Sequence, residues 1–223
     1  MSMDAVRAIV DTQDLIAQLF NIKKAENIVF TQNATYALNT AILGTMSNGG
    51  HIVVTEMDHN SVLRPACLPG NYTVVKADKS GYVHAEDVEK AVRKDRNLIV
   101  CTDASNVWGT IQAVYAFGRI AKKHKIPFLL DVAQTAGSIN IDAEKMNADM
   151  IAFPGHKGLM GPLGTGGLYV KSPEELAPLA TGGTGSNSES VSQPEFMPDK
   201  FHSGTMNTPA IKALGAGVKY VMK

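Results

Sequence analysis

Two apolar runs decide the fold: residues 127–132, PFLLDV, and residues 150–153, MIAF, which continue into PGHKG at 154–158. Neither run alternates apolar with polar residues, and continuous runs of this kind are typical of strands buried on both faces of a parallel sheet. Each run is followed by side chains that carry chemistry, Asp131 after the first and His156 and Lys157 after the second. We therefore expect two buried strands that end in reactive groups.

The rest of the chain alternates short apolar runs with stretches of helical periodicity. This alternation predicts an α/β fold, a mostly parallel sheet with helices on both faces. Further strands are expected at residues 27–30, 52–55, 72–76, 98–102 and 168–170, and helices at 4–20, from 34 onward, at 85–93, at 114–125 and at 207–222. Residues 181–192 form the one clear loop of low complexity.

Composition excludes several classes of protein. The chain has 223 residues, with 21 Lys and Arg against 21 Asp and Glu, so the balanced charge argues against a nucleic-acid partner. No apolar run approaches the ~20 residues that span a bilayer, and the N-terminus has no signal-peptide pattern, so no membrane partner is expected. The two cysteines form no CxxC, which favours a reducing, cytoplasmic setting and argues against a metal site.

Polar groups follow the expected strands where ligands bind in open α/β sheets, at the carboxyl ends. Motifs for other chemistries are absent: there is no Walker loop, no GxSxG and no HExxH. The glycines of 161–167 precede a strand and so do not form a dinucleotide fingerprint. What remains is Asp131-x-x-Gln134 after one strand and Gly155-His156-Lys157-Gly158 after the next. A lysine that forms a Schiff base, with an aspartate for a pyridinium nitrogen, is the residue pair of pyridoxal 5'-phosphate (PLP) chemistry.

At these residues the sequence resembles the class V aminotransferases of PLP fold type I, especially the cysteine desulfurase and selenocysteine lyase branch. The matching stretches, in order, are FTQNATYALNTAI, TEMDHNSVLRP, DASNVWGTIQAV, LLDVAQTAGSINID, ADMIAFPGHKGLMGPLGTGGLYV and KFHSGTMNTPAIKALGAGVKYV. Together they span residues 27–222. The resemblance implies the PLP-binding large domain of a PLP-dependent enzyme that acts on an amino acid.

The resemblance also implies a role for each residue around the cofactor ring. Lys157 forms the Schiff base, Asp131 pairs with the pyridine nitrogen, and His59 stacks on the ring and relays protons. Gln134 and Asn106 contact the phenolic oxygen. Ordinary structural roles stay open beside these: a solvated lysine, an aspartate that caps a short helix beginning near residue 133, a satisfied loop histidine and a turn asparagine.

For the phosphate, the resemblance implies donors from several segments. Thr35 and the backbone N–H groups of Asn33 and Ala34 stand where a helix begins, which is a natural anion site. His156 adds a ring N–H, and Thr205 is contributed across a homodimer interface, which implies shared active sites. One departure is Pro154, where family members commonly carry a Ser or Thr; proline has neither a hydroxyl nor an N–H, so one phosphate donor is missing.

Two parts of the family's architecture have no match in these 223 residues. We expect residues 1–223 to be the large domain alone, without an N-terminal LDNAAT-like segment and without the small C-terminal domain. That domain supplies the arginine for the substrate carboxylate and, in desulfurases, the nucleophilic cysteine. Cys101 lies in an apolar strand and Cys67 follows a helix-like stretch, and neither suits that role.

Three interpretations remain from the sequence. The first is a PLP-dependent desulfurase-like enzyme or aminotransferase, with cysteine the favoured substrate. The second is a truncated or split family member that binds PLP or a partner chain without turnover. The third is a generic α/β nucleotide-binding domain, which the run of matched motifs disfavours. The sequence does not choose among desulfurase, aminotransferase and lyase chemistry.

Overall fold

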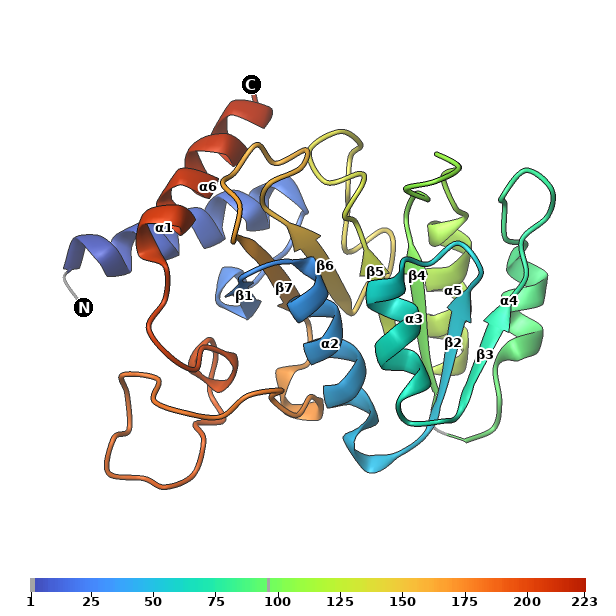
Figure 1. The fold of residues 1–223 in the computed structure, drawn as a ribbon, viewed down its shortest axis with the longest axis horizontal. Helices are drawn as coiled ribbons and strands as arrows, with labels where there is room; N and C mark the ends of the chain where they lie inside the picture. The colour runs from blue at the N-terminus through green and yellow to red at the C-terminus, as the bar shows by residue number, and fades with distance from the viewer. Residues whose placement is uncertain (1–2, 96) are drawn as a thin grey trace.

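A computed structural model describes residues 3–95 and 97–223. Within this part of the chain, seven strands form one sheet in the order β1-β7-β6-β5-β4-β2-β3 (Figure 1). The strand bounds are β1 Ile28–Thr31, β2 His51–Thr55, β3 Tyr72–Val75, β4 Asn97–Thr102, β5 Phe128–Asp131, β6 Met150–Pro154 and β7 Gly166–Val170. The strands expected from the sequence are present, each within two residues of its expected bounds.

One strand, β7, runs against the others. Strands β2 to β6 are mutually parallel, whereas β7 is antiparallel to β6 and to β1. Because two reversals cancel, β1 points the same way as β2 to β6. The C-terminal ends of six strands therefore lie along one side of the sheet, which we call the carboxyl edge; the opposite side is the amino edge.

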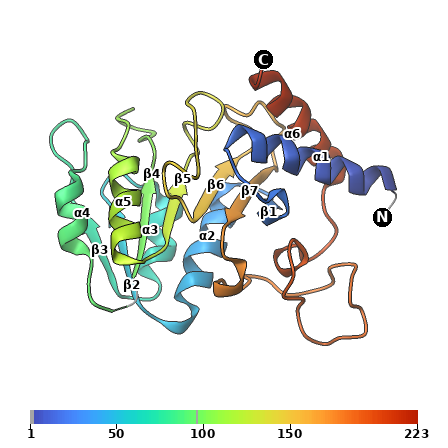
Figure 2. The same ribbon diagram turned by 180° about the vertical axis from the view of Figure 1, so that it is seen from behind.

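Helices cover both faces of the sheet. Figure 1 shows α2 (Ala34–Thr45) and α3 (Asn60–Cys67) on one face, and Figure 2 shows the other face, covered by α1 (Met3–Leu19), α4 (Ala85–Ala91), α5 (Val114–His124) and α6 (Thr208–Val221). Short 3₁₀ turns complete the elements: η1 Ala25–Asn27, η2 Met46–Asn48, η3 Pro173–Glu175 and η4 Asp199–Phe201. The predicted α/β class and its two-sided cover are confirmed.

Each face of the sheet has its own apolar core. On the α2 and α3 face the core includes Leu38, Ile42 and Val62, and on the other face Phe20 and Phe117 are fully buried. Alternate residues of β4 and β5 point into the two cores, so the middle of each strand, 98–101 and 128–130, is continuously apolar. This is the physical basis of the continuous apolar runs in the sequence.

The sequence indicated a helix-like stretch before Cys67 but did not predict where α3 begins. This helix has eight residues, contains Pro65, and begins directly after His59, whose side chain accepts a hydrogen bond from Ser61 N. A short helix with an internal proline carries little periodic signal, and its stability comes from packing against α2 and β2. Its position matters because it brings Ser61 to the carboxyl edge.

The loop from 177 to 198 has no regular element, in line with the expected loop at 181–192. Among the described residues, no helix has both the length and the apolar character that crossing a membrane requires.

Candidate active site

The carboxyl edge brings most of the predicted site residues to one side of the sheet. Asp131 ends β5 and is paired in register with Thr102 of β4 and Ala152 of β6. Lys157 lies five residues beyond Ala152, in the loop that leaves β6. His59 follows β2, and Asn33 to Thr35 follow β1 at the start of α2. The sheet order thus places Asp131 centrally, with the lysine loop on the next strand.

Asp131 is the most constrained of these residues. It is buried, with 2% of its surface exposed, and Oδ1 accepts a hydrogen bond from Ala133 N at 2.9 Å. Its Oδ2 makes no hydrogen bond with the residues that the structure describes. Burial raises the pKa of this carboxyl from 3.8 to about 6, against the opposing effects of the Ala133 hydrogen bond and the Lys157 charge. Oδ1 thus caps the segment at Ala133, which is a turn and not the expected short helix, and Oδ2 is left unused by the described residues.

The loop that carries Lys157 is held tightly by glycine contacts. Gly161 N donates to Gly155 O at 2.7 Å, which closes the loop on itself. A side chain on Gly158 would collide with the carbonyl of Ala136, and one on Gly155 with the hydroxyl of Thr165. The GHKG loop therefore packs directly on the turn that follows Asp131, and only glycine allows that approach. Within the described residues the exposed Lys157 side chain has no hydrogen-bond or ion-pair partner.

Two further buried carboxyls lie beside Asp131, and sequence reasoning gave neither a role. Asp58 follows β2; its Oδ1 accepts from Thr102 N at 2.6 Å and its Oδ2 from Thr55 N at 2.6 Å. Burial raises the pKa of Asp58 to about 7, with the charge of Asp131 adding to the effect. Asp103 follows β4, is 2% exposed, and leaves its Oδ2 unpaired among the described residues.

Burial likewise raises the pKa of Asp103, and the Thr135 hydroxyl acts in the opposite direction. Three acids on adjacent strand ends cannot all ionise cheaply in a buried setting, and a cation placed there is stabilised. A protonated pyridine nitrogen is such a cation. The signal available in the sequence was the repetition of an Asp at or just after the ends of three expected strands, which are neighbours in the sheet.

His59 belongs to a small polar cluster at the starts of α2 and α3. Its Nδ1 lies 2.9 Å from Ser61 Oγ and accepts from Ser61 N at 3.1 Å, and Ser61 Oγ lies 2.8 Å from Thr35 Oγ1. His59 and Thr35 are exposed. Sequence reasoning singled out both but missed Ser61, because the start of the helix that positions it was not predicted.

The start of α2 has the form expected of an anion site. Asn33 is the N-cap residue, and its Oδ1 accepts from Tyr36 N at 2.9 Å. The first N–H groups of a helix have no partner within the helix, and here they face the carboxyl edge. The side chain of Asn33 is thus engaged in capping, and the backbone around Ala34 and Thr35 is the part free to hold an anion.

The remaining predicted residues lie at the carboxyl edge or beside it, and no hydrogen bond from the described residues holds their side chains in place. Gln134, Asn106 and His156 are exposed, in the loops that leave β5, β4 and β6. Thr205 is exposed in the segment before α6. Their side chains make no hydrogen bond with the described residues, so their roles stay predictions. Pro154 ends β6 and pairs with Gly166, so the strand continues to the residue before the loop.

Neither cysteine is placed for catalysis. Cys101 is buried in β4, and burial, with the charges of the three acids, raises the pKa of its thiol well above 9. Cys67 is exposed, but it ends α3, which runs from the carboxyl edge back toward the amino edge. Among the described residues, no cluster of His, Cys, Asp or Glu has the form of a metal site.

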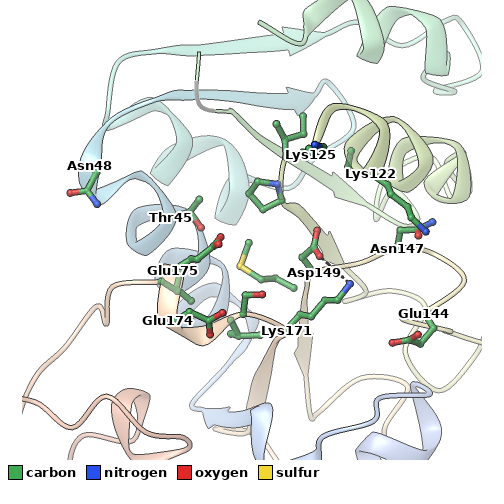
Figure 3. A pocket seen from close by; sticks show the side chains of 17 residues that line it. Thr45, Asn48, Lys122, Lys125, Glu144, Asn147, Asp149, Lys171, Glu174 and Glu175 are labelled. Carbon is green, nitrogen blue, oxygen red and sulfur yellow. Dashed lines mark ion pairs between the residues drawn. The ribbon is translucent and has the colours of Figure 1, made fainter. Parts of the chain in front are cut away.

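One cavity lies away from these residues. A cavity of about 840 Å³ opens at the amino edge, between the C-terminal end of α5, the starts of β5 and β6 and the end of β7. Figure 3 shows Lys171 and Asp149 pointing toward each other across it, and their charged atoms are 3.5 Å apart. It contains none of the predicted site residues, so it is separate from the candidate active site.

Solved structures identify the class to which this fold belongs. A cysteine desulfurase from Thermococcus onnurineus NA1 superimposes with a TM-score of 0.91 at 31% identity, over 99% of this chain and 58% of the other. SspA, solved in complex with cysteine, superimposes with a TM-score of 0.87 at 32% identity, over 97% of this chain and 61% of the other. The fold is that of PLP-dependent enzymes of fold type I.

Sequence comparison identifies the family. The model of the family Aminotransferase class-V matches residues 1–223. A probable cysteine desulfurase of Methanothermobacter thermautotrophicus is 36% identical over 226 residues, which cover 97% of this chain and 56% of the relative. The chain belongs to the class-V aminotransferase family, whose members use PLP. It spans about half the length of the curated relatives it matches.

Proposed function

We propose that this chain is the cofactor-binding large domain of a PLP-dependent enzyme that acts on an amino acid, with cysteine the favoured substrate. The observation that carries the proposal is the buried Asp131, whose Oδ2 is unused by the described residues, packed beside the loop of Lys157. The likeness to cysteine desulfurases supports the choice of substrate.

The residues present fit PLP. The three buried acids form an anionic floor for a protonated pyridine nitrogen, and Asp131 presents the accessible oxygen. The start of α2, with Thr35, suits the phosphate, and the lysine loop supplies a primary amine between them. Bound at this edge, PLP supplies an electron sink for the α-carbon of an amino acid.

Each residue then has a defined task. Asp131 holds a proton at the ring nitrogen, Lys157 attaches the cofactor, and His59 covers the ring and holds or moves a proton at Nε2. Thr35, the backbone at Asn33 and Ala34, and the ring N–H of His156 bind phosphate. Gln134 and Asn106 are proposed to orient the ring through its phenolic oxygen.

Turnover needs groups beyond those in this chain. Cys101 is buried and Cys67 lies at the far end of α3, so neither is placed to attack a substrate sulfur at this edge. The family resemblance assigns the arginine for the substrate carboxylate to the small domain. We propose that those groups come from outside residues 1–223 and that Thr205 reaches the phosphate of a second copy in a homodimer. The free cysteines agree with a cytoplasmic setting.

The absorption spectrum of the purified chain with added PLP tests the proposal. We expect a visible band that is lost in Lys157→Ala and retained in Lys171→Ala, a matched lysine variant at the amino edge. A spectrum equal to that of free PLP in the parent chain would sink the proposal. With L-cysteine we expect no sulfide release above the Lys157→Ala background; release above it would contradict the assignment of the thiol to a region outside this chain.

A further inference from the structure

A hydrogen-bond chain links two of the proposed cofactor residues through a third. Thr35 Oγ1 lies 2.8 Å from Ser61 Oγ, and Ser61 Oγ lies 2.9 Å from His59 Nδ1. The proposed function gives Thr35 to the phosphate and His59 to the ring. It gives Ser61 no task, although Ser61 contacts both.

The donor and acceptor in each of these hydrogen bonds follow from the cap of α3, where His59 is the N-cap residue. Ser61 N donates to His59 Nδ1 at 3.1 Å, so Nδ1 carries no proton and the neutral ring has its proton on Nε2. A hydroxyl 2.9 Å from an unprotonated ring nitrogen donates to it. Ser61 has a single hydroxyl proton, which is used at His59, so Ser61 accepts from Thr35. The hydroxyl proton of Thr35 therefore points at Ser61.

A phosphate group at the start of α2 competes for that proton. If Thr35 donates to the phosphate, the 2.8 Å contact survives only when Ser61 donates to Thr35. The 2.9 Å contact to His59 then needs a proton on Nδ1. The ring stays neutral: it loses the Nε2 proton to solvent and takes one from solvent at Nδ1, so no proton is gained or lost overall.

The strengths of the hydrogen bonds favour this exchange of donors and acceptors along Thr35, Ser61 and His59. It gives up the cap bond from Ser61 N, a neutral bond at a partly exposed site. It gains a bond from Thr35 to an anion, and charge-assisted bonds are roughly twice as strong as neutral ones. The helix dipole at α2 favours the same bound anion.

We propose that Ser61 is a positioning residue that couples a phosphate group seated at Thr35 to the tautomer of His59. Nε2 then becomes a proton acceptor only when the phosphate is in place. This inference rests on the proposed function, because it takes the phosphate seat and the task of His59 from it.

Side-chain ¹⁵N NMR of the labelled chain at about pH 8, where a free imidazole is neutral, tests the coupling. Inorganic phosphate is the probe. Without it, we expect His59 to show an unprotonated Nδ1 and a protonated Nε2. With saturating phosphate, we expect the two to exchange character. A His59 ring that keeps its first pattern at every phosphate concentration contradicts the proposal.

Variants separate coupling from simple binding. Ser61→Ala and Thr35→Val are expected to hold His59 in the Nε2–H form with phosphate present, and Thr35→Ser to restore the response. Ser190→Ala, in the exposed 181–192 loop, is expected to respond like the parent chain. A response by Ser61→Ala equal to that of the parent would refute the role of Ser61. Backbone amide spectra report whether each variant is folded.

Failure of this inference is distinguishable from failure of the proposed function. Attachment of PLP to Lys157 is measured by absorbance and does not depend on the tautomer of His59. A chain that binds PLP at Lys157 but leaves His59 unchanged with phosphate refutes only the coupling. A chain that switches His59 with phosphate but never attaches PLP refutes only the proposed function.

Discussion

The two edges of the sheet differ in how their charges are compensated. At the carboxyl edge, Asp58, Asp103 and Asp131 are buried with raised pKa values, and among the described residues none of them forms an ion pair. The charge of Lys157 acts on Asp131 alone. At the amino edge, acids and lysines line an open cavity and form exposed pairs such as Lys171 with Asp149. The cavity at the amino edge thus carries ordinary surface electrostatics, and the carboxyl edge carries the uncompensated charge.

The difference in charge compensation between the two edges locates the candidate site. Burying three carboxyls without a matching cation costs stability, and such strain is typical of sites arranged for a ligand. Exposed ion pairs contribute little to stability, and they do not indicate a ligand site. The variants below test whether the contrast between the two edges is real.

The largest effect is expected for Asp131→Asn. Removing one member of a buried charge pair typically costs 2 kcal/mol or more of binding, so PLP affinity should fall at least about 30-fold. Equilibrium titration by absorbance measures this. Asp149→Asn, at the amino edge, is the matched control and is expected to leave PLP affinity unchanged; an equal loss in both variants would erase the contrast.

The same variant should stabilise the cofactor-free chain at alkaline pH. Because the pKa of Asp131 is raised from 3.8 to about 6, its ionised form destabilises the fold above pH 6. That penalty is up to about 3 kcal/mol, and it fades as pH falls through 6 toward 3.8. Urea unfolding at pH 8 and pH 4.5 should therefore show a gain for Asp131→Asn that shrinks at the lower pH.

A less favourable change is expected for Asp58→Asn, because a lost hydrogen bond opposes the removal of the charge. Both oxygens of Asp58 accept backbone N–H groups, from Thr55 and Thr102, and an amide offers only one acceptor. One buried N–H is left unpaired, which costs about 1–3 kcal/mol. The amide also removes a carboxyl whose pKa burial raises to about 7, which relieves an ionisation penalty at pH 8. Because the two effects oppose each other, urea unfolding at pH 8 should show a smaller gain than that of Asp131→Asn, or a loss. A gain like that of Asp131→Asn would mean that Asp58 also serves a ligand rather than the sheet.

The smallest effect is expected for Lys171→Ala. Its partner Asp149 is 3.5 Å away, and the lysine side chain is 52% exposed. Exposed pairs of this kind contribute under about 1 kcal/mol. Thermal unfolding should change little in the variant. A large loss of stability would show that the amino edge depends on compensated charge as strongly as the carboxyl edge does.

The sequence predicted most of the fold because the central strands are buried on both faces. Continuous apolar runs such as 128–130 have few alternatives in an α/β protein, and the polar residues after them, Asp131 and Lys157, were found from the same runs. Their neighbours in space were harder to find. The packing of Gly158 on Ala136, which joins two loops 22 residues apart, has no sequence period that would reveal it.

Ser61 and the acid cluster show the limit in physical terms. Helix α3 is short and contains Pro65, so its start, and with it the contact between Ser61 and Thr35, depends on packing rather than on periodicity. The burial of Asp58 and Asp103 likewise depends on which strands become neighbours, because β2 pairs with β4 rather than with β1. Residues that act within one segment were predictable, and residues that act between segments were not.

We propose that PLP is attached at the carboxyl edge through Lys157. Borohydride reduction of the chain with PLP, followed by peptide mass mapping, tests it most directly. We expect one dominant PLP adduct, on the peptide that contains Lys157. None above background is expected on Lys122, Lys125 or Lys171 at the amino edge. An adduct spread over the surface lysines, or concentrated at the amino edge, would contradict it.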